Sequence, residues 1–110
     1  ISLTTNTSII TSISNDINYE SIFSRQIEAV GNQGDILFAI STSGKSKNIN
    51  RAIRQAKKQK MIVILLTGSR KIINKQIDYQ INVPAVRVDR IQEMHIFVGH
   101  IICDLLEKNI

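Results

Sequence analysis

A cluster of hydroxyl side chains follows directly after an apolar run in this sequence. Residues 36–40 read ILFAI, and residues 41–46 read STSGKS. A hydroxyl group can donate one hydrogen bond to a phosphate oxygen, and this segment offers four of them, on Ser41, Thr42, Ser43 and Ser46. The cluster is too rich in hydroxyl groups for a core strand. We therefore predict a phosphate-binding loop at the end of a buried strand.

The residues around this loop support a phosphate ligand. Ser46 precedes the segment KNINRAIRQAKKQK (47–60), whose spacing predicts an amphipathic helix. Ser46 would be the N-cap of that helix, whose free N–H groups and positive end favour an anion. Gly44 would allow a tight turn and a close approach of the backbone to the ligand. The alternative is a capped turn that binds nothing, for which a single serine would suffice.

Two nucleotide-binding patterns can be excluded. Gly44-Lys45-Ser46 matches the end of the P-loop pattern, but that pattern needs a glycine five residues before Gly44, where Ala39 stands. The dinucleotide pattern fails because the loop has a single glycine. We therefore expect no nucleotide cofactor.

Short, mainly apolar runs alternate with helical patterns along the chain. The runs predict strands at residues 36–40, 61–68 and 79–83, and the helical patterns predict helices at residues 21–31, 47–60 and 89–110. Buried strands joined in this way indicate a parallel sheet covered on both faces. We expect one α/β domain over residues 1–110, a three-layer αβα sandwich with a mostly parallel, doubly wound sheet. In such sheets ligands bind beyond the carboxyl ends of the strands.

The first twenty residues and the segment 70–76 are less regular. Residues 1–5 (ISLTT) predict a strand, and the Ser/Thr/Asn-rich residues 6–21 predict an irregular, partly buried connection. Residues 70–76 predict a short helix or a turn. Because the chain begins at Ile1 rather than at a methionine, we expect a further segment before it in the full-length protein.

The composition is that of an ordinary globular domain, with 43% hydrophobic and 21% charged residues. No stretch reaches the roughly 18 uninterrupted apolar residues of a membrane span. The formal charge of +5 comes mainly from residues 51–60 and 69–75, which lack the interleaved aromatic side chains that stack on bases. We therefore expect no membrane and no nucleic-acid partner. The single cysteine, Cys103, suits a cytoplasmic location.

The predicted final helix carries two polar side chains that could share one cavity. Gln92 and His100 are eight residues apart, about 80° around an α-helix and two turns along it. His95 lies about 140° from His100, so we expect it to face elsewhere. A histidine on a buried helix can be a satisfied core residue or a proton-transfer group. Apolar positions cover more than one stripe of this helix, so we expect it to be buried on most sides.

Three segments together resemble a known family. They are NDINYESIFSRQIEAVGNQGD (15–35), GDILFAISTSGKSKNI (34–49) and DRIQEMHIFVGHIICDLLEK (89–108). The chain resembles the SIS (sugar isomerase) domain family and, within it, the phosphoheptose isomerases. The resemblance implies an isomerase that converts D-sedoheptulose 7-phosphate to D-glycero-D-manno-heptose 7-phosphate through an enediol, towards ADP-heptose for bacterial lipopolysaccharide. It also implies a homotetramer with sites between subunits.

The resemblance implies roles for individual residues as well. Those that match substrate-binding positions are Asn15, Asp16, Ser41, Thr42, Ser43, Ser46, Asp89 and Gln92. His100 matches the catalytic histidine, and in zinc-bearing members both Gln92 and His100 are metal ligands. Two ligands are too few for a closed zinc site. The family's glutamate base and second histidine ligand belong to the segment that we expect before Ile1.

Two non-catalytic functions remain open. The SIS-type protein that binds the bacterial replication initiator also resembles this chain through RIQEMH (90–95), but it lacks a histidine at the position of His100. A sugar-phosphate-sensing regulatory domain would keep the serine loop and would not need His100. The combination of His100 with an intact STSGKS segment favours the isomerase.

Overall fold

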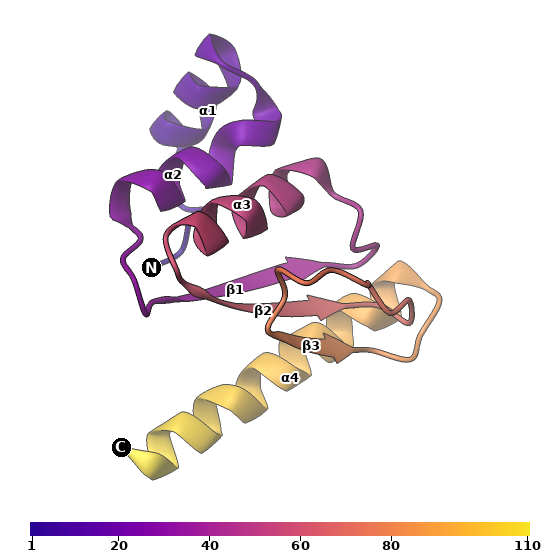
Figure 1. The fold of residues 1–110 in the computed structure, drawn as a ribbon. Coiled ribbons are helices and arrows are strands. Elements are labelled where there is room, and N and C mark those ends of the chain that lie inside the picture. The colour runs from indigo at the N-terminus through magenta and orange to yellow at the C-terminus, as the bar shows by residue number, and fades with distance from the viewer.

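The structure is a computed structural model that describes residues 1–110. Its elements follow in the order α1 (Thr7–Asp16), the short 3-10 helix η1 (Tyr19–Ser21), α2 (Ile22–Val30), β1 (Ile36–Ser41), α3 (Lys47–Lys58), β2 (Ile62–Thr67), β3 (Tyr79–Asn82) and α4 (Val88–Asn109). Figure 1 shows α2 and α3 on one face of the sheet and α4 on the other. The predicted three-layer α/β architecture is therefore confirmed.

The sheet has three parallel strands in the order β1-β2-β3. The pairing of β1 with β2 begins at Ile36 and Ile62 and ends at Ser41 and Thr67. Both six-residue strands are continuous runs of mainly aliphatic residues, as expected where helices cover a parallel sheet. The two strands therefore end side by side, and the segments that leave them lie at one edge of the sheet.

The core lies between the sheet and helices α2 and α3. Helix α3 is amphipathic: its small and branched residues Ala52, Ile53 and Ala56 are buried, whereas its basic residues face outwards. They pack with Val63 and Leu65 of β2 in one apolar cluster. This packing fixes α3, and with it the loop that precedes α3, against the ends of the strands.

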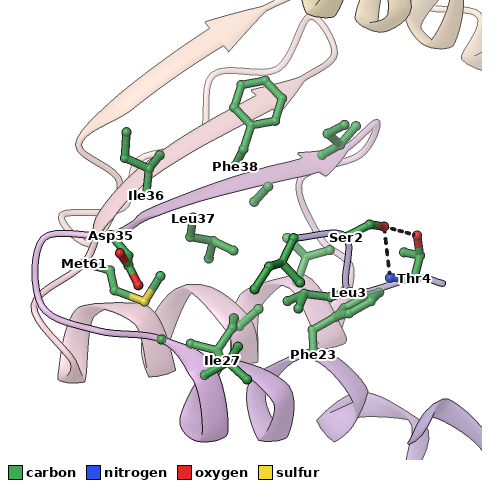
Figure 2. A pocket seen from close by; sticks show the side chains of 17 residues that line it. Ser2, Leu3, Thr4, Phe23, Ile27, Asp35, Ile36, Leu37, Phe38 and Met61 are labelled. Atoms are coloured by element: carbon green, nitrogen blue, oxygen red, sulfur yellow. Dashed lines mark hydrogen bonds between the residues drawn. The ribbon is translucent and has the colours of Figure 1, made fainter. Parts of the chain in front are cut away.

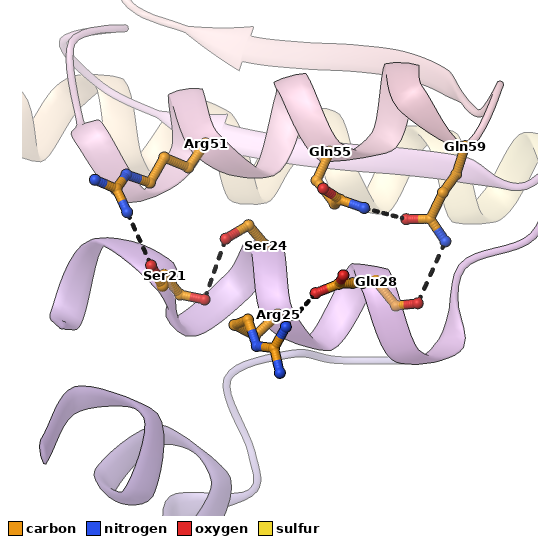
Figure 3. A network of polar contacts seen from close by, with 7 residues as sticks. All are labelled: Ser21, Ser24, Arg25, Glu28, Arg51, Gln55 and Gln59. Carbon is orange, nitrogen blue, oxygen red and sulfur yellow. Dashed lines mark hydrogen bonds and ion pairs between the residues drawn. The ribbon is translucent and has the colours of Figure 1, made fainter. Parts of the chain in front are cut away.

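Polar contacts tie α2 to α3 along their length (Figure 3). At one end the Arg51 guanidinium donates to the Ser21 hydroxyl at 2.9 Å. At the other end the Gln59 amide donates to the carbonyl oxygen of Gly31 at 2.8 Å and accepts from Gln55 at 3.1 Å. These contacts hold the two helices together as one layer.

The N-terminal region differs from the prediction in two ways. Residues 1–5 form a turn and not a strand, because no neighbouring strand supplies them with backbone hydrogen bonds. The stretch predicted to be irregular contains helix α1 instead. The Asn6 side chain caps this helix by accepting from the Ile9 N–H at 3.1 Å. Residues 70–76 contain a turn and no helix, which agrees with one of the two predicted forms.

Helix α4 also differs from expectation, because it is not buried on most sides. Only Ile91 and His95 are buried, and they face β2. Several large apolar side chains of α4 remain exposed, namely Met94, Ile96, Phe97, Ile101, Leu105 and Leu106. One sheet face can cover only one stripe of a helix, and no second layer lies against the rest. Neither this helix nor any other combines the length and apolarity that crossing a bilayer requires.

Candidate functional site

The serine loop, residues 41–46, lies at the carboxyl edge of the sheet and leads directly into α3. Ser41 ends β1 with its side chain buried, while Thr42 is half-buried and Ser43 and Ser46 are exposed. The structure thus places all four predicted hydroxyl groups in one turn between a strand end and a helix start. This is the position at which ligands bind in parallel α/β sheets.

Hydrogen bonds within the serine loop fold it back on itself. The Ser41 Oγ accepts from the Gly44 N–H at 3.1 Å and lies 3.2 Å from the Ser46 Oγ. The Ser43 Oγ accepts from the Lys45 N–H at 3.1 Å. The loop is therefore preformed, and its exposed hydroxyl groups at positions 43 and 46 are available to a ligand.

The backbone at position 44 has a left-handed conformation that residues other than glycine rarely adopt. Its φ is +65°, and a Cβ atom added there would lie 2.5 Å from the Ile72 Cδ1. Both the left-handed backbone and the close contact favour glycine at this position. The prediction that Gly44 permits a tight turn is confirmed.

The start of α3 is suited to an anion. Ser46 is the N-cap, as predicted, but its hydroxyl makes no hydrogen bond to the first amides of the helix and contacts Ser41 instead. No acidic residue stands in the first turn. The basic residues Lys47 and Arg51 of α3 are each paired at 3.1 Å with the Glu20 carboxylate. The free N–H groups and the dipole of α3 favour negative charge near the serine loop.

The first turn of α4 lies at the same edge of the sheet as the serine loop. Gly68, just after β2, donates its N–H to the Thr42 carbonyl at 3.1 Å. A Cβ atom added to Gly68 would meet that carbonyl oxygen at 2.7 Å and the Ile91 Cδ1 at 2.8 Å. Gly68 therefore lies between the serine loop and α4, and Asp89 and Gln92 flank Ile91 at this end of the helix.

Asp89 and Gln92 are both accessible. Asp89 is paired with Arg87 at 2.6 Å, and its side chain is about half exposed. Gln92 is exposed and forms no side-chain hydrogen bond within the chain. Asp89 is therefore part of an ion pair, and Gln92 presents a free amide.

His100 does not lie beside the serine loop within one chain. It is exposed on α4, about 12 Å along the helix axis from Gln92, and α4 runs back from the carboxyl edge of the sheet on the face opposite α2 and α3 (Figure 1). Within one chain, His100 and the serine loop therefore lie apart. Its exposure leaves it free to act at a site formed with other protein.

Asn15 and Asp16 are also apart from the serine loop. They are exposed in the last turn of α1, which packs on η1 and α2. Asp16 borders a hollow between α1 and α2 together with Ile13 and Arg25. This chain alone does not bring the pair to the loop.

Sequence reasoning did not identify Thr67 and His95 as neighbours of the site. The Thr67 hydroxyl is fully buried without a hydrogen-bond partner, close to Gly44 on the serine-loop side of the sheet. The Thr67 carbonyl oxygen lies 3.0 Å from the Nε2 atom of His95, which belongs to α4 on the opposite face of the sheet. His95 thus faces β2 and not the same direction as His100, as its helical angle predicts. The threonine next to Gly68 at the end of the run 61–68 was the available signal.

The residues present do not by themselves form a zinc site. No group of three or more His, Cys, Asp or Glu side chains is close enough to hold a metal ion. Gln92 and His100 could supply two ligands, whereas a structural site uses four and a catalytic site three. Further ligands would have to come from outside these residues.

Comparison with known proteins agrees with the architecture. A family model described as the SIS domain matches residues 1–68. Phosphoheptose isomerase 2 of Campylobacter jejuni is 49% identical over 111 aligned positions, which are 100% of this chain and 55% of the relative. Phosphoheptose isomerase of Burkholderia pseudomallei is 47% identical and is covered over 56% of its length.

Two solved structures that resemble this chain are also phosphoheptose isomerases. The structure of phosphoheptose isomerase from Neisseria gonorrhoeae matches 98% of this chain with a TM-score of 0.91 and 40% identity, over 61% of that protein. The phosphoheptose isomerase from Francisella tularensis matches with the same TM-score and 35% identity, over 59% of its chain. The chain thus spans little more than half the length of the relatives that it matches. On sequence and fold together, it belongs to the SIS domain family.

Proposed function

We propose that the full-length protein is a phosphoheptose isomerase that converts D-sedoheptulose 7-phosphate to D-glycero-D-manno-heptose 7-phosphate. The observation that carries this proposal is the preformed serine loop at the start of α3, in a chain 49% identical to a phosphoheptose isomerase. The product would feed ADP-heptose synthesis for lipopolysaccharide. A cytoplasmic location is part of the proposal, and the single cysteine, Cys103, suits it.

The phosphate end of the substrate would bind the serine loop. The hydroxyl groups of Ser43 and Ser46 are exposed and can donate to phosphate oxygens. The free backbone N–H groups at the start of α3 follow directly in the chain, and a phosphate at a helix N-terminus gains from them and from the helix dipole. Thr42, half-buried in the same turn, is the third donor, whereas Ser41 holds the loop together.

The sugar chain would then undergo proton transfer. Aldose–ketose isomerisation removes a proton from one carbon, returns it to the neighbouring carbon and moves another between the two oxygens. A histidine is suited to each of these transfers near neutral pH, and His100 is the candidate by resemblance. By resemblance, the carboxylate that shares the proton transfer with this histidine would lie outside these residues. The chain would then supply the phosphate-binding loop and one acid–base group.

His100 would act at the serine loop of a neighbouring subunit. Two observations support this: the histidine is exposed and distant from the loop of its own chain, and α4 carries an exposed apolar face of the kind that subunit contacts bury. We propose a homotetramer with shared sites, in which Asn15, Asp16, Asp89 and Gln92 contact the sugar. Zinc would bind only if the rest of the protein or another subunit adds ligands to Gln92 and His100.

One observation favours a second candidate, a sugar-phosphate-sensing domain. The serine loop is complete within this chain, whereas His100 lies apart from it. A sensing domain would bind a sugar phosphate with the loop and would make no use of the histidine.

The experiment is an assay of the purified full-length protein with sedoheptulose 7-phosphate, with and without a chelator. Formation of the aldoheptose phosphate supports the isomerase, and loss of turnover with chelator shows metal dependence. Calorimetric binding of the sugar phosphate without turnover, in protein supplied with zinc, would instead support the sensing domain.

A further inference from the structure

Two buried hydroxyl groups lie side by side at the carboxyl edge of the sheet. Ser41 ends β1 and Thr67 ends β2, and the two residues are partners in the register of the sheet. Partners on neighbouring parallel strands direct their side chains to the same face of the sheet. Ser41 is 5% exposed and Thr67 is 0% exposed. Neither side chain is therefore accessible to solvent, although both carry a polar group.

This pair faces the helical layer that the serine loop enters. Strand β1 lies at one edge of the sheet, beside an apolar groove, and Figure 2 shows its Leu37 pointing towards Ile27 of α2. Because alternate residues of a strand share a face, Ser41 points to the same side as Leu37. A Cβ atom added to Gly44 would lie 3.4 Å from the Thr67 Oγ1. The Thr67 hydroxyl therefore lies directly against the serine loop.

The Thr67 hydroxyl has no hydrogen-bond partner. Burying an unpaired hydroxyl costs free energy, and most buried polar side chains have a partner. The backbone of this residue is firmly held, because its carbonyl oxygen accepts from the Val83 N–H at 3.0 Å and lies 3.0 Å from the His95 Nε2. An unpaired donor fixed in this way beside a phosphate-binding loop points to a function in binding.

The serine loop has an acceptor for this donor. A hydroxyl group donates one hydrogen and accepts with two lone pairs. The Ser41 Oγ accepts from the Gly44 N–H at 3.1 Å and lies 3.2 Å from the Ser46 Oγ, and either of the two hydroxyl groups can be the donor. If Ser46 gives its single hydrogen to a phosphate, Ser41 must donate to Ser46. One lone pair of Ser41 then remains open.

We propose that Thr67 is a positioning residue whose hydroxyl donates to the Ser41 Oγ when a phosphate monoester occupies the serine loop. The hydrogens of Thr67, Ser41 and Ser46 then point one after another towards the anion. Hydrogen bonds in such a chain strengthen one another in a low-dielectric site. Neighbouring strands are about 4.8 Å apart, so side-chain rotation is enough to join the two hydroxyl groups. The inference rests on the phosphate site of the proposed function and not on isomerisation.

The proposal requires opposite effects of Thr67 on stability and on binding. Thr67→Val replaces the hydroxyl by a methyl group, which removes the cost of the unpaired group, so the ligand-free variant is at least as stable as the wild type. Its affinity for phosphate falls about threefold to tenfold, the effect of one hydrogen bond. Thr67→Ser loses a buried methyl group and is less stable. Because it keeps the donor, it binds phosphate within about twofold of the wild type.

Calorimetry on the full-length protein tests the proposal, with sedoheptulose 7-phosphate and inorganic phosphate as the two probes. Thr67→Val is expected to weaken both by the same factor, because the serine loop meets only the phosphate group. Thr7→Val is the matched control: it removes a threonine hydroxyl on the exposed start of α1 and binds like the wild type. Urea unfolding without ligand supplies the stabilities.

Two results overturn the proposal. One is wild-type affinity in Thr67→Val. The other is a set of affinities that falls in the same order as the stabilities, because it shows that Thr67 acts only through packing.

The measurement also separates this inference from the proposed isomerase. A wild type that binds both probes without turnover contradicts the isomerase, and the Thr67 variants still decide the inference. Turnover together with an unchanged affinity of Thr67→Val contradicts the inference alone. A wild type that binds neither probe contradicts both.

Discussion

The imidazole of His95 donates from Nε2 to the backbone carbonyl oxygen of Thr67 at 3.0 Å, joining α4 to the last residue of β2. A carbonyl oxygen can only accept, so the proton is on Nε2 and the buried Nδ1 is left without a partner. The same carbonyl accepts from the Val83 N–H at 3.0 Å. One backbone atom thus connects β2, the end of β3 and α4.

We predict that His95→Leu lowers the free energy of unfolding by about 1 kcal/mol, the usual net value of one hydrogen bond. His95→Gln should lose less than half of that, because the glutamine amide can place a donor where Nε2 stands. Urea unfolding of the full-length variants measures both. Equal stability of the leucine variant and the wild type would show that the bond contributes nothing.

The serine loop should account for affinity towards sugar phosphates. We predict that Ser43→Ala combined with Ser46→Ala weakens binding by about a hundredfold or more, since each of the two lost hydrogen bonds to a charged group contributes about 1.5–3 kcal/mol. Calorimetry with sedoheptulose 7-phosphate provides the measurement. Ser8→Ala, on the exposed side of α1, is the matched control and should bind like the wild type. An unchanged affinity of the double variant would count against the loop as the phosphate site.

Catalysis by His100 should require a second subunit. We predict that His100→Ala abolishes turnover while sugar-phosphate binding remains, whereas Glu107→Ala on the same helix leaves turnover unchanged. Mixing subunits of His100→Ala with subunits of the double serine variant should restore part of the activity, because some sites then combine an intact loop with an intact histidine. If the mixture stays inactive after subunit exchange, loop and histidine do not meet between subunits.

Gly44 and Gly99 should respond in opposite ways to alanine. At Gly44 the positive φ and the 2.5 Å approach to the Ile72 side chain predict destabilisation by more than about 1 kcal/mol. Gly99 lies inside α4 with nothing within 4 Å of an added Cβ, so alanine should stabilise the helix by up to about 1 kcal/mol. Thermal unfolding of both variants checks the contrast, and a stabilised Gly44→Ala protein would contradict it.

Asp78 should make stability depend on pH in acid. The Lys57 ammonium donates to both carboxylate oxygens at 2.9 Å, and the Val63 N–H donates at 2.7 Å; these bonds lower the pKa of Asp78 below its ordinary value of 3.8. A lowered pKa means that the ionised form stabilises the fold above pH 3.8. This contribution is lost as the pH falls through the lower folded-state value.

We therefore predict that Asp78→Asn is less stable than the wild type at neutral pH and that the difference shrinks below pH 3.8. Asp104→Asn breaks an exposed pair with Lys108 and should change stability by less than about 1 kcal/mol. Denaturant unfolding from pH 7 downwards compares the three proteins. A constant difference between the wild type and Asp78→Asn at all pH values would argue against the ionic contribution.

The sequence predicted the elements whose patterns are complete within the chain. Apolar runs bounded by turn residues located β1 and β2 to within one residue, and amphipathic spacing located α3. Helix α1 was missed because its serine, threonine and isoleucine residues are weak helix formers. Its Asn6 cap and the apolar residues Ile9, Ile10 and Ile13 were the signals that could have found it.

Long-range placement was harder to predict. Helical angles correctly separated His95 from His100, but they do not say which side faces the sheet. A strand at residues 1–5 would need a neighbouring strand to pair with, and the structure places none beside them. The burial predicted for α4 likewise depends on what packs against it, and within one chain only the stripe with Ile91 and His95 has a partner.

The free edge of β1 also bears on how the protein behaves when it is produced in pieces. The uncharged, proline-free run ILFAIS has the composition of segments that stack into cross-β fibrils. In a recombinant product limited to these 110 residues, the edge of β1 would be exposed. Two copies of the product could then associate through this edge. Low solubility of such a product would then be a property of the exposed edge and would say nothing about the stability of the full-length protein.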